Sequence, residues 1–174
     1  MVVFAVNLVR ADEEKDAPEK DSITGAYQIW NANQLYWFAG LLNGTRTKIN
    51  ESGYEVTVES DSKAYSAKAV LMTDIVVNEE VLNVDGSLAK EASELLSWIP
   101  IRNVLESETG YSGTFDGQGY TISGLYCVTE SNPTGLFGYI ESSGSVKNVA
   151  IKDSYFNSSG GLIGSICGQF GKSR

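Results

Sequence analysis

Gly135-Leu136-Phe137-Gly138-Tyr139-Ile140 returns 26 residues later as Gly161-Leu162-Ile163-Gly164-Ser165-Ile166. A second echo, after 24 residues, pairs Ile122-Ser123-Gly124-Leu125 with Val146-Lys147-Asn148-Val149. Short apolar runs that recur at such a period, separated by Gly, Ser and Asn, are typical of a unit that cannot bury its own apolar face and stacks on a copy of itself. The repeat therefore predicts an all-β solenoid.

Each Gly-Leu-X-Gly element places two large residues between glycines, which assigns expected positions within a coil. The large side chains are expected to line the interior or to pack at its corners: Leu136, Phe137, Ile140, Leu162, Ile163 and Ile166. A glycine can turn a corner with positive φ or pass close to a neighbouring chain about 4.8 Å away. We therefore expect four glycines to hold the bends: Gly135, Gly138, Gly161 and Gly164.

Composition limits the classes of function. The 174 residues suffice for about one domain, and the 42% apolar and 20% charged residues are those of a folded chain. No stretch approaches the roughly 20 apolar residues of a membrane span. The net charge of −9 repels phosphate backbones and argues against nucleic acid as a partner. With no His and two Cys, the sequence predicts no metal or haem site and no cofactor.

The chain is expected to divide at about residue 21. Residues 1–9 are apolar and residues 12–21 are charged and acidic, which resembles a truncated secretory signal followed by a solvated linker. A plain first strand at residues 1–9 is the alternative. Residues 22–174 are expected to form the β-helix domain, which stops part way through a coil and is therefore expected to be incomplete at its C-terminus.

Three segments before residue 111 depart from the coil pattern. A capping helix is predicted near residues 33–43, where Leu35, Phe38 and Leu42 recur at helical spacing and Gly44 follows. Residues 45–66 are expected to form an inserted hairpin, with a strand at 54–59 after a turn at 51–53. Residues 83–97 are expected to form a second insertion, a turn followed by a short helix capped by Ser87.

The two cysteines are predicted to stay free thiols. The repeat alignment puts Cys127 opposite Ile151, facing inward, and Cys167 opposite Glu141, facing outward. Because a disulfide requires Cβ atoms within about 4 Å, side chains that diverge in this way cannot be joined.

Several segments, taken together and in order, resemble the Glug-motif proteins. They are residues 33–39, 71–75, 98–101 and 111–125, followed by the two Gly-Leu-X-Gly elements. Glug-motif proteins are surface and secreted proteins of gut and oral bacteria, often adhesin-like, and the motif also occurs in the accessory region of immunoglobulin-A-cleaving metallopeptidases. The resemblance implies a right-handed single-stranded parallel β-helix, here of about four or five coils, on an exported protein.

Two groups of residues in the sequence are candidates for a binding site. Phe115-Asp116-Gly117-Gln118-Gly119 could be a calcium loop, but Gln118 is the only further oxygen donor nearby, and an Asx turn at Asp116 is the plainer interpretation. Trp30 and Trp98, with Tyr36 and Trp37, could form an aromatic platform that contacts sugars. Packing of the helical aromatics into the cap is the alternative.

Catalysis is not predicted. Polysaccharide lyases and hydrolases occur among β-helices, but the acids of the repeat region, Asp116, Glu130, Glu141 and Asp153, fall at unmatched positions. We therefore expect a non-catalytic structural or adhesin-like scaffold, outside the cell or on its surface, with a host glycan or surface protein as candidate partner. The alternatives are a carbohydrate-binding module and the accessory β-helix region of a larger secreted peptidase.

Overall fold

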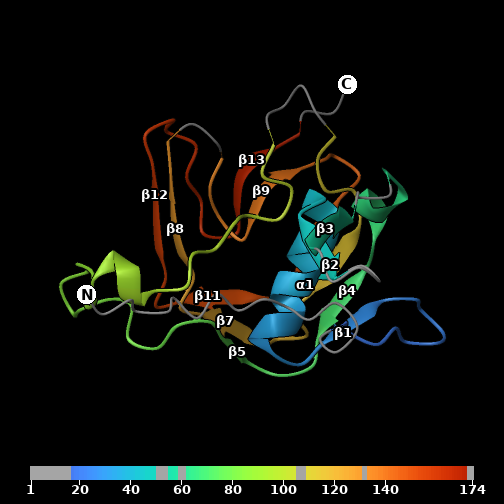
Figure 1. Cartoon of the computed structure of the whole chain (residues 1–174), viewed down its shortest axis with the longest axis horizontal. Helices are drawn as coiled ribbons and strands as arrows, with labels where there is room; N and C mark the ends of the chain where they lie inside the picture. The colour runs from blue at the N-terminus through green and yellow to red at the C-terminus, as the bar shows by residue number, and fades with distance from the viewer. Residues whose placement is uncertain (1–16, 50–54, 59–61, 105–108, 131–132, 172–174) are drawn as a thin grey trace.

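The structure is a computed structural model that describes residues 17–49, 55–58, 62–104, 109–130 and 133–171. Within these ranges the chain is rich in short strands and contains a single α-helix (Figure 1). The strands are β1 (Tyr27–Ile29), β2 (Arg46–Ile49), β3 (Glu55–Val58), β4 (Ala69–Leu71), β5 (Ile75–Val76), β6 (Thr114–Asp116), β7 (Thr121–Ser123), β8 (Tyr126–Thr129), β9 (Phe137–Ile140), β10 (Ser145–Lys147), β11 (Ala150–Lys152), β12 (Tyr155–Ser158) and β13 (Cys167–Phe170). The helices are α1 (Ala32–Asn43) and two 3₁₀ turns, Ser62–Ser66 and Ala92–Glu94.

Most strands belong to small parallel sheets. One sheet has the order β1-β4-β6-β10, a second has the order β11-β7-β5, and β8 with β12 and β9 with β13 form two-stranded sheets. All of these pairs are parallel. Only β2 and β3 pair as antiparallel neighbours among the described strands. The predicted mostly parallel β structure is thus present, divided among several small sheets.

Four successive strands pair, in the same order, with the next four. β6, β7, β8 and β9 form the middle rung, residues 114–140, and β10, β11, β12 and β13 form the terminal rung, residues 145–170. Phe115 lies opposite Val146 and Ile122 lies opposite Ile151. Equivalent positions are therefore 29 to 31 residues apart, so each rung repeats the path of the one before it.

This register corrects the predicted alignment of the repeats. Ile122 was expected opposite Val146, and Leu136 opposite Leu162, but β9 and β13 place Phe137 opposite Cys167. The 26-residue repeat in the sequence is shorter than the structural period because the two Gly-Leu-X-Gly elements occupy different positions in their rungs. The second copy lies in the turn before β13, whereas the first copy enters β9.

The register also decides which apolar residues lie inside. Leu136, Phe137 and Ile140 are buried as predicted. Leu162 and Ile163, which were expected to line the interior, are 41% and 50% exposed. They belong to the turn at the edge of the stack, where no described strand lies beyond them.

A first rung, residues 69–111, precedes the middle rung. β4 pairs with β6 and β5 pairs with β7, and the chain bends at Thr73 between β4 and β5. Isolated parallel bridges continue the rung, joining Ser97 to Tyr126, Ile101 to Phe137 and Tyr111 to Ile140. The chain from Ser97 to Ile101 therefore runs beside the middle rung after the second insertion.

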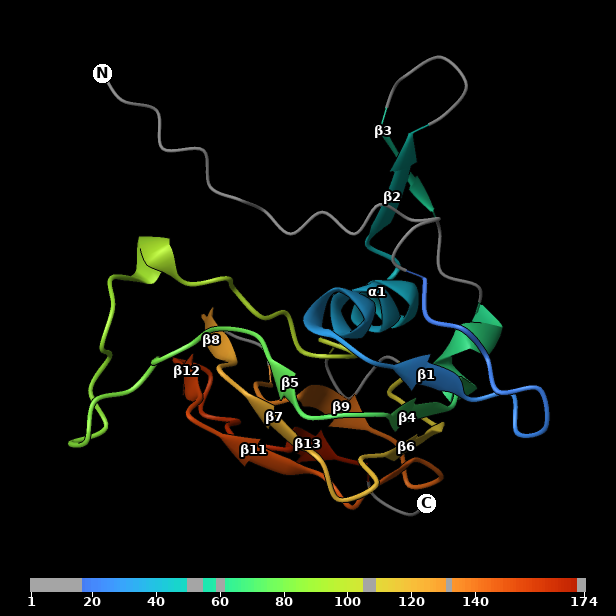
Figure 2. The same cartoon turned by 90° about the horizontal axis from the view of Figure 1, so that it is seen from below.

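Helix α1 closes the end of the stack next to the first rung (Figure 2). Asn31 caps its first turn by accepting a hydrogen bond from the backbone N–H of Gln34, and Gly44 ends it in the left-handed conformation. Leu35, Phe38 and Leu42, spaced to lie on one face, are fully buried. This confirms the predicted helix, whose apolar face packs into the core beside the first rung.

The two predicted insertions leave the stack at the expected places. β2 and β3 form the antiparallel hairpin, which projects beyond α1 in Figure 2, while the turn predicted at residues 51–53 lies outside the described residues. In the second insertion, Ser87 caps no helix. Its N–H and hydroxyl instead bond the Asp85 carboxylate in a tight turn, and a single 3₁₀ turn over residues 92–94 replaces the expected helix.

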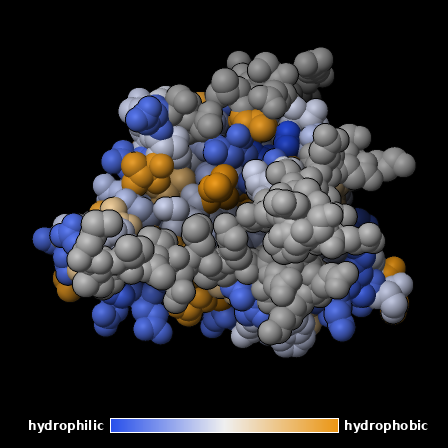
Figure 3. All heavy atoms as spheres, viewed as in Figure 1, coloured by the Kyte–Doolittle hydropathy of each residue, from blue (hydrophilic) through white to orange (hydrophobic). Residues whose placement is uncertain are grey.

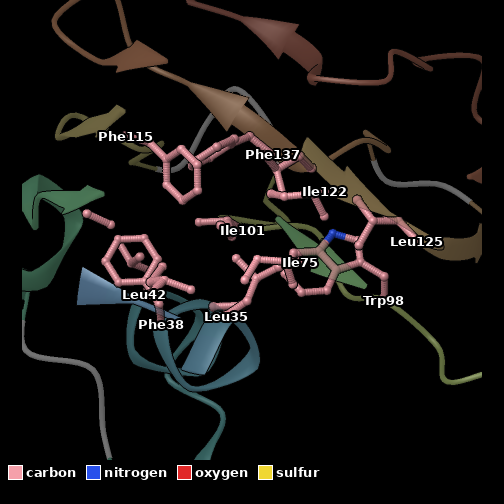
Figure 4. Packing of buried hydrophobic residues seen from close by; sticks show 14 of the residues in the cluster. Leu35, Phe38, Leu42, Ile75, Trp98, Ile101, Phe115, Ile122, Leu125 and Phe137 are labelled. Atoms are coloured by element: carbon pink, nitrogen blue, oxygen red, sulfur yellow. The ribbon is translucent and has the colours of Figure 1, made fainter. Parts of the chain in front are cut away.

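The core runs from α1 through the rungs. Phe38 of α1 contacts Tyr111 and Phe115, whose rings lie 6.5 and 6.2 Å away, and Phe137 lies 5.5 Å from Phe115 (Figure 4). Burial raises the pKa of Tyr111 well above its ordinary value, and the hydroxyl donates to the carbonyl of Ala67. One continuous apolar cluster thus joins the cap to the middle rung.

Residues 17–21, the end of the predicted acidic linker, are attached to the body. Pro18 is buried, Lys20 forms an antiparallel bridge with Tyr27, and the N–H of Gln28 donates to the carbonyl of Glu19. The signal-like residues 1–9 lie outside the described residues.

Candidate functional site

Asp116 forms the Asx turn that was favoured over a calcium loop. Its Oδ1 accepts a hydrogen bond from the backbone N–H of Gln118 at 2.9 Å, which holds the turn between β6 and β7. Gln118 takes a positive φ of 51°, and Gly119 follows with a φ of 89°. The side-chain amide of Gln118 turns away from the carboxylate and donates to the carbonyl of Leu71 in the first rung.

The terminal rung supplies the remaining partners of Asp116. The Lys147 ammonium lies 3.3 Å from Oδ2, and the Asn148 side-chain amide donates to Oδ1 at 3.1 Å. The hydrogen bond from Gln118 is the main cause that lowers the pKa of Asp116, assisted by Asn148 and Lys147. This carboxylate is therefore ionised and already satisfied by groups of this chain.

The glycines selected from the sequence serve two different purposes. Gly161, with a φ of 79° and open space around it, forms a bend as predicted. Gly138 does not: it lies within β9, where a Cβ atom would stand 2.7 Å from the carbonyl oxygen of Arg102. Likewise, a Cβ on Gly135 would meet the Gly164 carbonyl oxygen at 2.4 Å. These two positions require glycine because two rungs approach closely.

Gly117 and Gly164 also face crowded backbone. A Cβ atom on Gly117 would lie 2.4 Å from the carbonyl oxygen of Asn148, and one on Gly164 would lie 2.2 Å from that of Cys167. Gly119 has open space and needs glycine for its backbone conformation alone.

The two tryptophans assigned to an aromatic platform lie in different environments. Trp98 is only 2% exposed, and its indole N–H donates to the carbonyl of Gly135, so the prediction that it contacts a ligand is wrong. Tyr36 packs edge-on against Trp98, and Trp37 packs on Tyr27 at 5.3 Å, as the cap interpretation expects. Trp30 alone of the proposed pair offers its ring to solvent, with 52% exposed.

Three polar residues join segments distant in sequence, a role that the sequence analysis did not assign to them. Both carboxylate oxygens of Asp153 accept backbone N–H groups just before the second insertion, those of Val81 and Leu82. Asn78 donates to the carbonyls of Leu96 and Gly124 and accepts from the N–H of Leu96. No local pattern marks Asp153 or Asn78, because their partners are 18 to 72 positions away.

Arg102 is the third of these residues and is 5% exposed. Its guanidinium donates to the carbonyls of Leu42 and Thr109 and lies 3.9 Å from the ring of Tyr65. The Asn43 side chain, at the end of α1, accepts the backbone N–H of Arg102. Together these contacts fasten the cap to the first rung.

The cysteines are free, as predicted, although one faces the other way. Cys127 is buried beside the Thr134 hydroxyl, and Cys167 lies opposite Phe137 and not opposite Glu141. Cys167 therefore faces inward, in a half-buried position. Burial raises the pKa of both thiols, so neither is a thiolate at neutral pH.

Other kinds of site were sought across the described ranges. Within them no group of three or more His, Cys, Asp or Glu side chains is placed to hold a metal ion. None of the helices seen there has the length and apolar character needed to cross a bilayer. On the face in Figure 3, apolar residues stand in small groups between hydrophilic ones. No family model, curated protein or solved structure matches this chain.

Proposed function

We propose that this chain is a non-catalytic structural scaffold, a right-handed single-stranded parallel β-helix of an exported, adhesin-like bacterial protein. The observation that carries the proposal is the register of the rungs. Four strands of the middle rung pair in order with four strands of the terminal rung, all parallel. Parallel strands in one sheet that are joined by crossovers are almost always connected with right-handed geometry, which supports the handedness.

The polar side chains support a structural role. Asp116, Asp153, Asn78 and Arg102 direct their charged or amide groups at the backbone of this same chain. An enzyme or ligand site needs such groups held toward a cleft with capacity left for substrate. Here most of that capacity is used to join rungs, insertions and cap.

The test of the scaffold proposal combines binding and turnover. Purified protein is applied to a glycan array at micromolar concentration and incubated with acidic and neutral polysaccharides. A scaffold yields neither saturable binding nor new reducing or unsaturated ends. Product release that scales with protein concentration would overturn the non-catalytic assignment.

Export is tested separately. The open reading frame containing this chain is tagged in its host, and the envelope, medium and cytoplasm are separated. A scaffold for display appears in the envelope or medium, and recovery only in the cytoplasm would contradict the adhesin-like role. Similarity to the Glug-motif proteins motivates this part of the proposal.

A carbohydrate-binding module is the second candidate, and the exposed ring of Trp30 favours it. Its indole is rigid, apolar and accessible, as sugar stacking requires. If the array reveals a ligand, Trp30→Ala should abolish the signal, while Ile23→Ala, another exposed apolar residue outside the rungs, should leave it unchanged. A ligand insensitive to Trp30→Ala would exclude this site.

A further inference from the structure

The junction at which α1 ends contains a chemically reactive pair of residues. Asn43 is the last residue of α1 and Gly44 follows it, and an Asn-Gly pair occurs at no other place in the sequence. Such a pair is labile in water, because glycine has no side chain to hinder the attack of its backbone nitrogen on the preceding side-chain amide. Whether the pair reacts therefore depends on how the fold holds it.

The reaction is deamidation through a succinimide ring. The backbone nitrogen of Gly44 gives its proton to solvent and bonds to Cγ of Asn43, while the bond from Cγ to Nδ2 breaks and the amino group takes up a proton and leaves as ammonia. Water then opens the ring at either carbonyl carbon, which gives aspartate or isoaspartate. One water is consumed and one ammonia is released, so no oxidant or cofactor is required.

In the folded chain both reacting groups are held by other partners. The N–H of Gly44 donates to the carbonyl of Gly40 in the last turn of α1. The Asn43 amide is bound at both ends: Nδ2 donates to the carbonyl of Pro100 at 3.0 Å, and Oδ1 accepts the backbone N–H of Arg102 at 2.7 Å. Attack on Cγ requires the amide to leave these partners and turn onto the Gly44 nitrogen. The reaction therefore requires α1 to separate from the first rung.

The contacts near the junction make that separation infrequent. Phe38 and Leu42 of α1 are fully buried in the core (Figure 4). The guanidinium of Arg102, itself 5% exposed, donates to the carbonyl of Leu42. The hydroxyl of Tyr36 donates to the carbonyl of Ser97, which ties α1 to the first rung at a second place. Segments held in this way open far less often than exposed loops and chain ends.

The product cannot restore the junction. Aspartate at position 43 has no side-chain N–H, so the carbonyl of Pro100 loses its donor. It also adds a negative charge at the C-terminus of α1, where the helix dipole is already negative. Isoaspartate lengthens the main chain by one carbon, which displaces the Gly44 N–H from the carbonyl of Gly40. A reacted chain is therefore expected to dock α1 less well than an unreacted one.

We propose that Asn43-Gly44 is a deamidation site that stays unreactive while α1 is docked on the first rung and that, once it has reacted, prevents α1 from docking as before. The modification is irreversible, so it accumulates in chains whose α1 has separated from the first rung. This inference rests on the contacts of the junction and does not depend on the proposed function.

Peptide mapping by mass spectrometry provides the test. The protein is incubated at mildly alkaline pH with and without urea, and the conversion of Asn43 to aspartate or isoaspartate is followed. Conversion should be at least about a hundredfold slower in the folded chain, since only the open fraction reacts. In urea, Gly44→Ala should slow the conversion, which assigns it to this junction. Equal rates with and without urea would overturn the proposal.

Two variants at the start of α1 change its stability without touching the junction. Asn31→Ala removes the oxygen that accepts the N–H of Gln34 and should speed the conversion of Asn43 about fivefold. Asn31→Gly is the milder matched control and should change the rate by less than about twofold. The exposed turn at Asp85 and Gly86, which forms isoaspartate through the same kind of ring, is an internal reference whose rate should stay constant. A conversion rate that does not respond to Asn31→Ala would contradict the requirement that α1 opens.

Asn43→Asp reproduces one product directly. This variant should have a lower melting temperature than the unmodified chain and faster hydrogen exchange in α1. Thr45→Asp is the control, because it adds the same charge beside the same end of α1 at an exposed position, and it should have a smaller effect on both measurements. If Asn43→Asp were as stable as the unmodified chain, a reacted chain would dock α1 as before and the proposal would be wrong.

Discussion

The middle and terminal rungs follow the same path but differ in what lies on either side of them. The middle rung is enclosed by the first rung and the terminal rung, and its inward residues Phe115, Ile122 and Phe137 are fully buried. The terminal rung has one neighbouring rung within the described chain, and its equivalent residues are half-buried. Similar short apolar segments are therefore buried in the core in the middle rung and partly exposed in the terminal rung.

This difference shows that the burial of a side chain depends on whether its rung has a neighbouring layer on both sides. A side chain facing along the stack direction becomes buried only when another layer covers it. At the first rung that layer is α1, whose aromatic and aliphatic residues replace a further rung. The comparison predicts that substitutions of one chemical kind should cost much more in the middle rung than in the terminal rung.

The largest effect is expected for Gly138→Val in the middle rung. A Cβ at this position would stand 2.7 Å from the carbonyl oxygen of Arg102 and 3.0 Å from the Cα of Asn103, both backbone atoms of the first rung. Backbone in a paired rung cannot retreat without breaking the ladder, so the free energy of unfolding should fall by about 4 kcal/mol or more. Urea denaturation followed by circular dichroism measures it.

Gly161→Val is the matched substitution in the terminal rung. Gly161 has a positive φ of 79° but no atom within 4 Å of the position of its Cβ. Backbone strain alone should cost about 1–3 kcal/mol, with no steric clash. If both substitutions cost the same, close approach of rungs is not what demands glycine at position 138.

The same substitution of phenylalanine by alanine can be compared in the middle and terminal rungs. Phe137 is fully buried in the middle rung, whereas Phe156 is half-buried in the terminal rung. Phe137→Ala should lower the free energy of unfolding by about 3–5 kcal/mol. Phe156→Ala should lower it by about 1–2 kcal/mol, because less apolar area leaves water there.

Urea denaturation followed by circular dichroism measures both losses at the same protein concentration and temperature. A Phe156→Ala loss equal to that of Phe137→Ala under those conditions would mean that the terminal rung is covered in the single chain. That result would remove the contrast between the rungs.

The sequence predicted the features that depend on residues close together in the chain, and it failed for features that depend on distant residues. Helix α1 was predicted because the spacing of Leu35 and Phe38 and the Gly44 that follows are local signals. The antiparallel hairpin was predicted from the alternation in residues 54–59 for the same reason. The Asx turn at Asp116 also depends on a partner only two residues away.

Register and burial were not predicted, because they depend on distant partners. Matching the Gly-Leu-X-Gly letters gave a period of 26, whereas the strand pairs give 29 to 31, since turns of unequal length separate equivalent strands. Leu162, like Leu136, is the leucine of a Gly-Leu-X-Gly element, but no described strand lies beyond it, and it is exposed. The burial of Trp98 and the bonds of Asp153 likewise arise from segments far along the chain.

The closed end offers a smaller test. Asn31→Ala removes the side-chain oxygen that accepts the N–H of Gln34 at the start of α1, at 3.0 Å. The expected loss is about 1 kcal/mol, and Asn31→Gly, which keeps a residue tolerated at this position, should cost only a few tenths. Since α1 covers the first rung, hydrogen exchange in β4 and β5 should rise with the alanine variant. Unchanged hydrogen exchange in β4 and β5 would mean that the stability of the first rung does not depend on α1.

A smaller effect is expected for Asp116→Asn, and it should depend on pH. The Gln118 N–H, with Asn148 and Lys147, lowers the pKa of Asp116 in the folded chain below that of the unfolded chain. A carboxylate with a lowered pKa stabilises the fold above its unfolded pKa, and that contribution disappears as the pH falls through the folded value. Asp116→Asn should therefore melt slightly below the unmodified protein at neutral pH, and the two curves should converge under acid.

Lys147→Met is the companion variant for this last test. It removes the ammonium that lies 3.3 Å from Oδ2 but leaves the hydrogen bond from Gln118 in place. Because an exposed ion pair contributes little, the loss should be well under about 1 kcal/mol and smaller than that of Asp116→Asn. A larger loss for Lys147→Met would mean that the charge pair between the rungs, and not the Asx turn within the middle rung, is the main stabilising contact of Asp116.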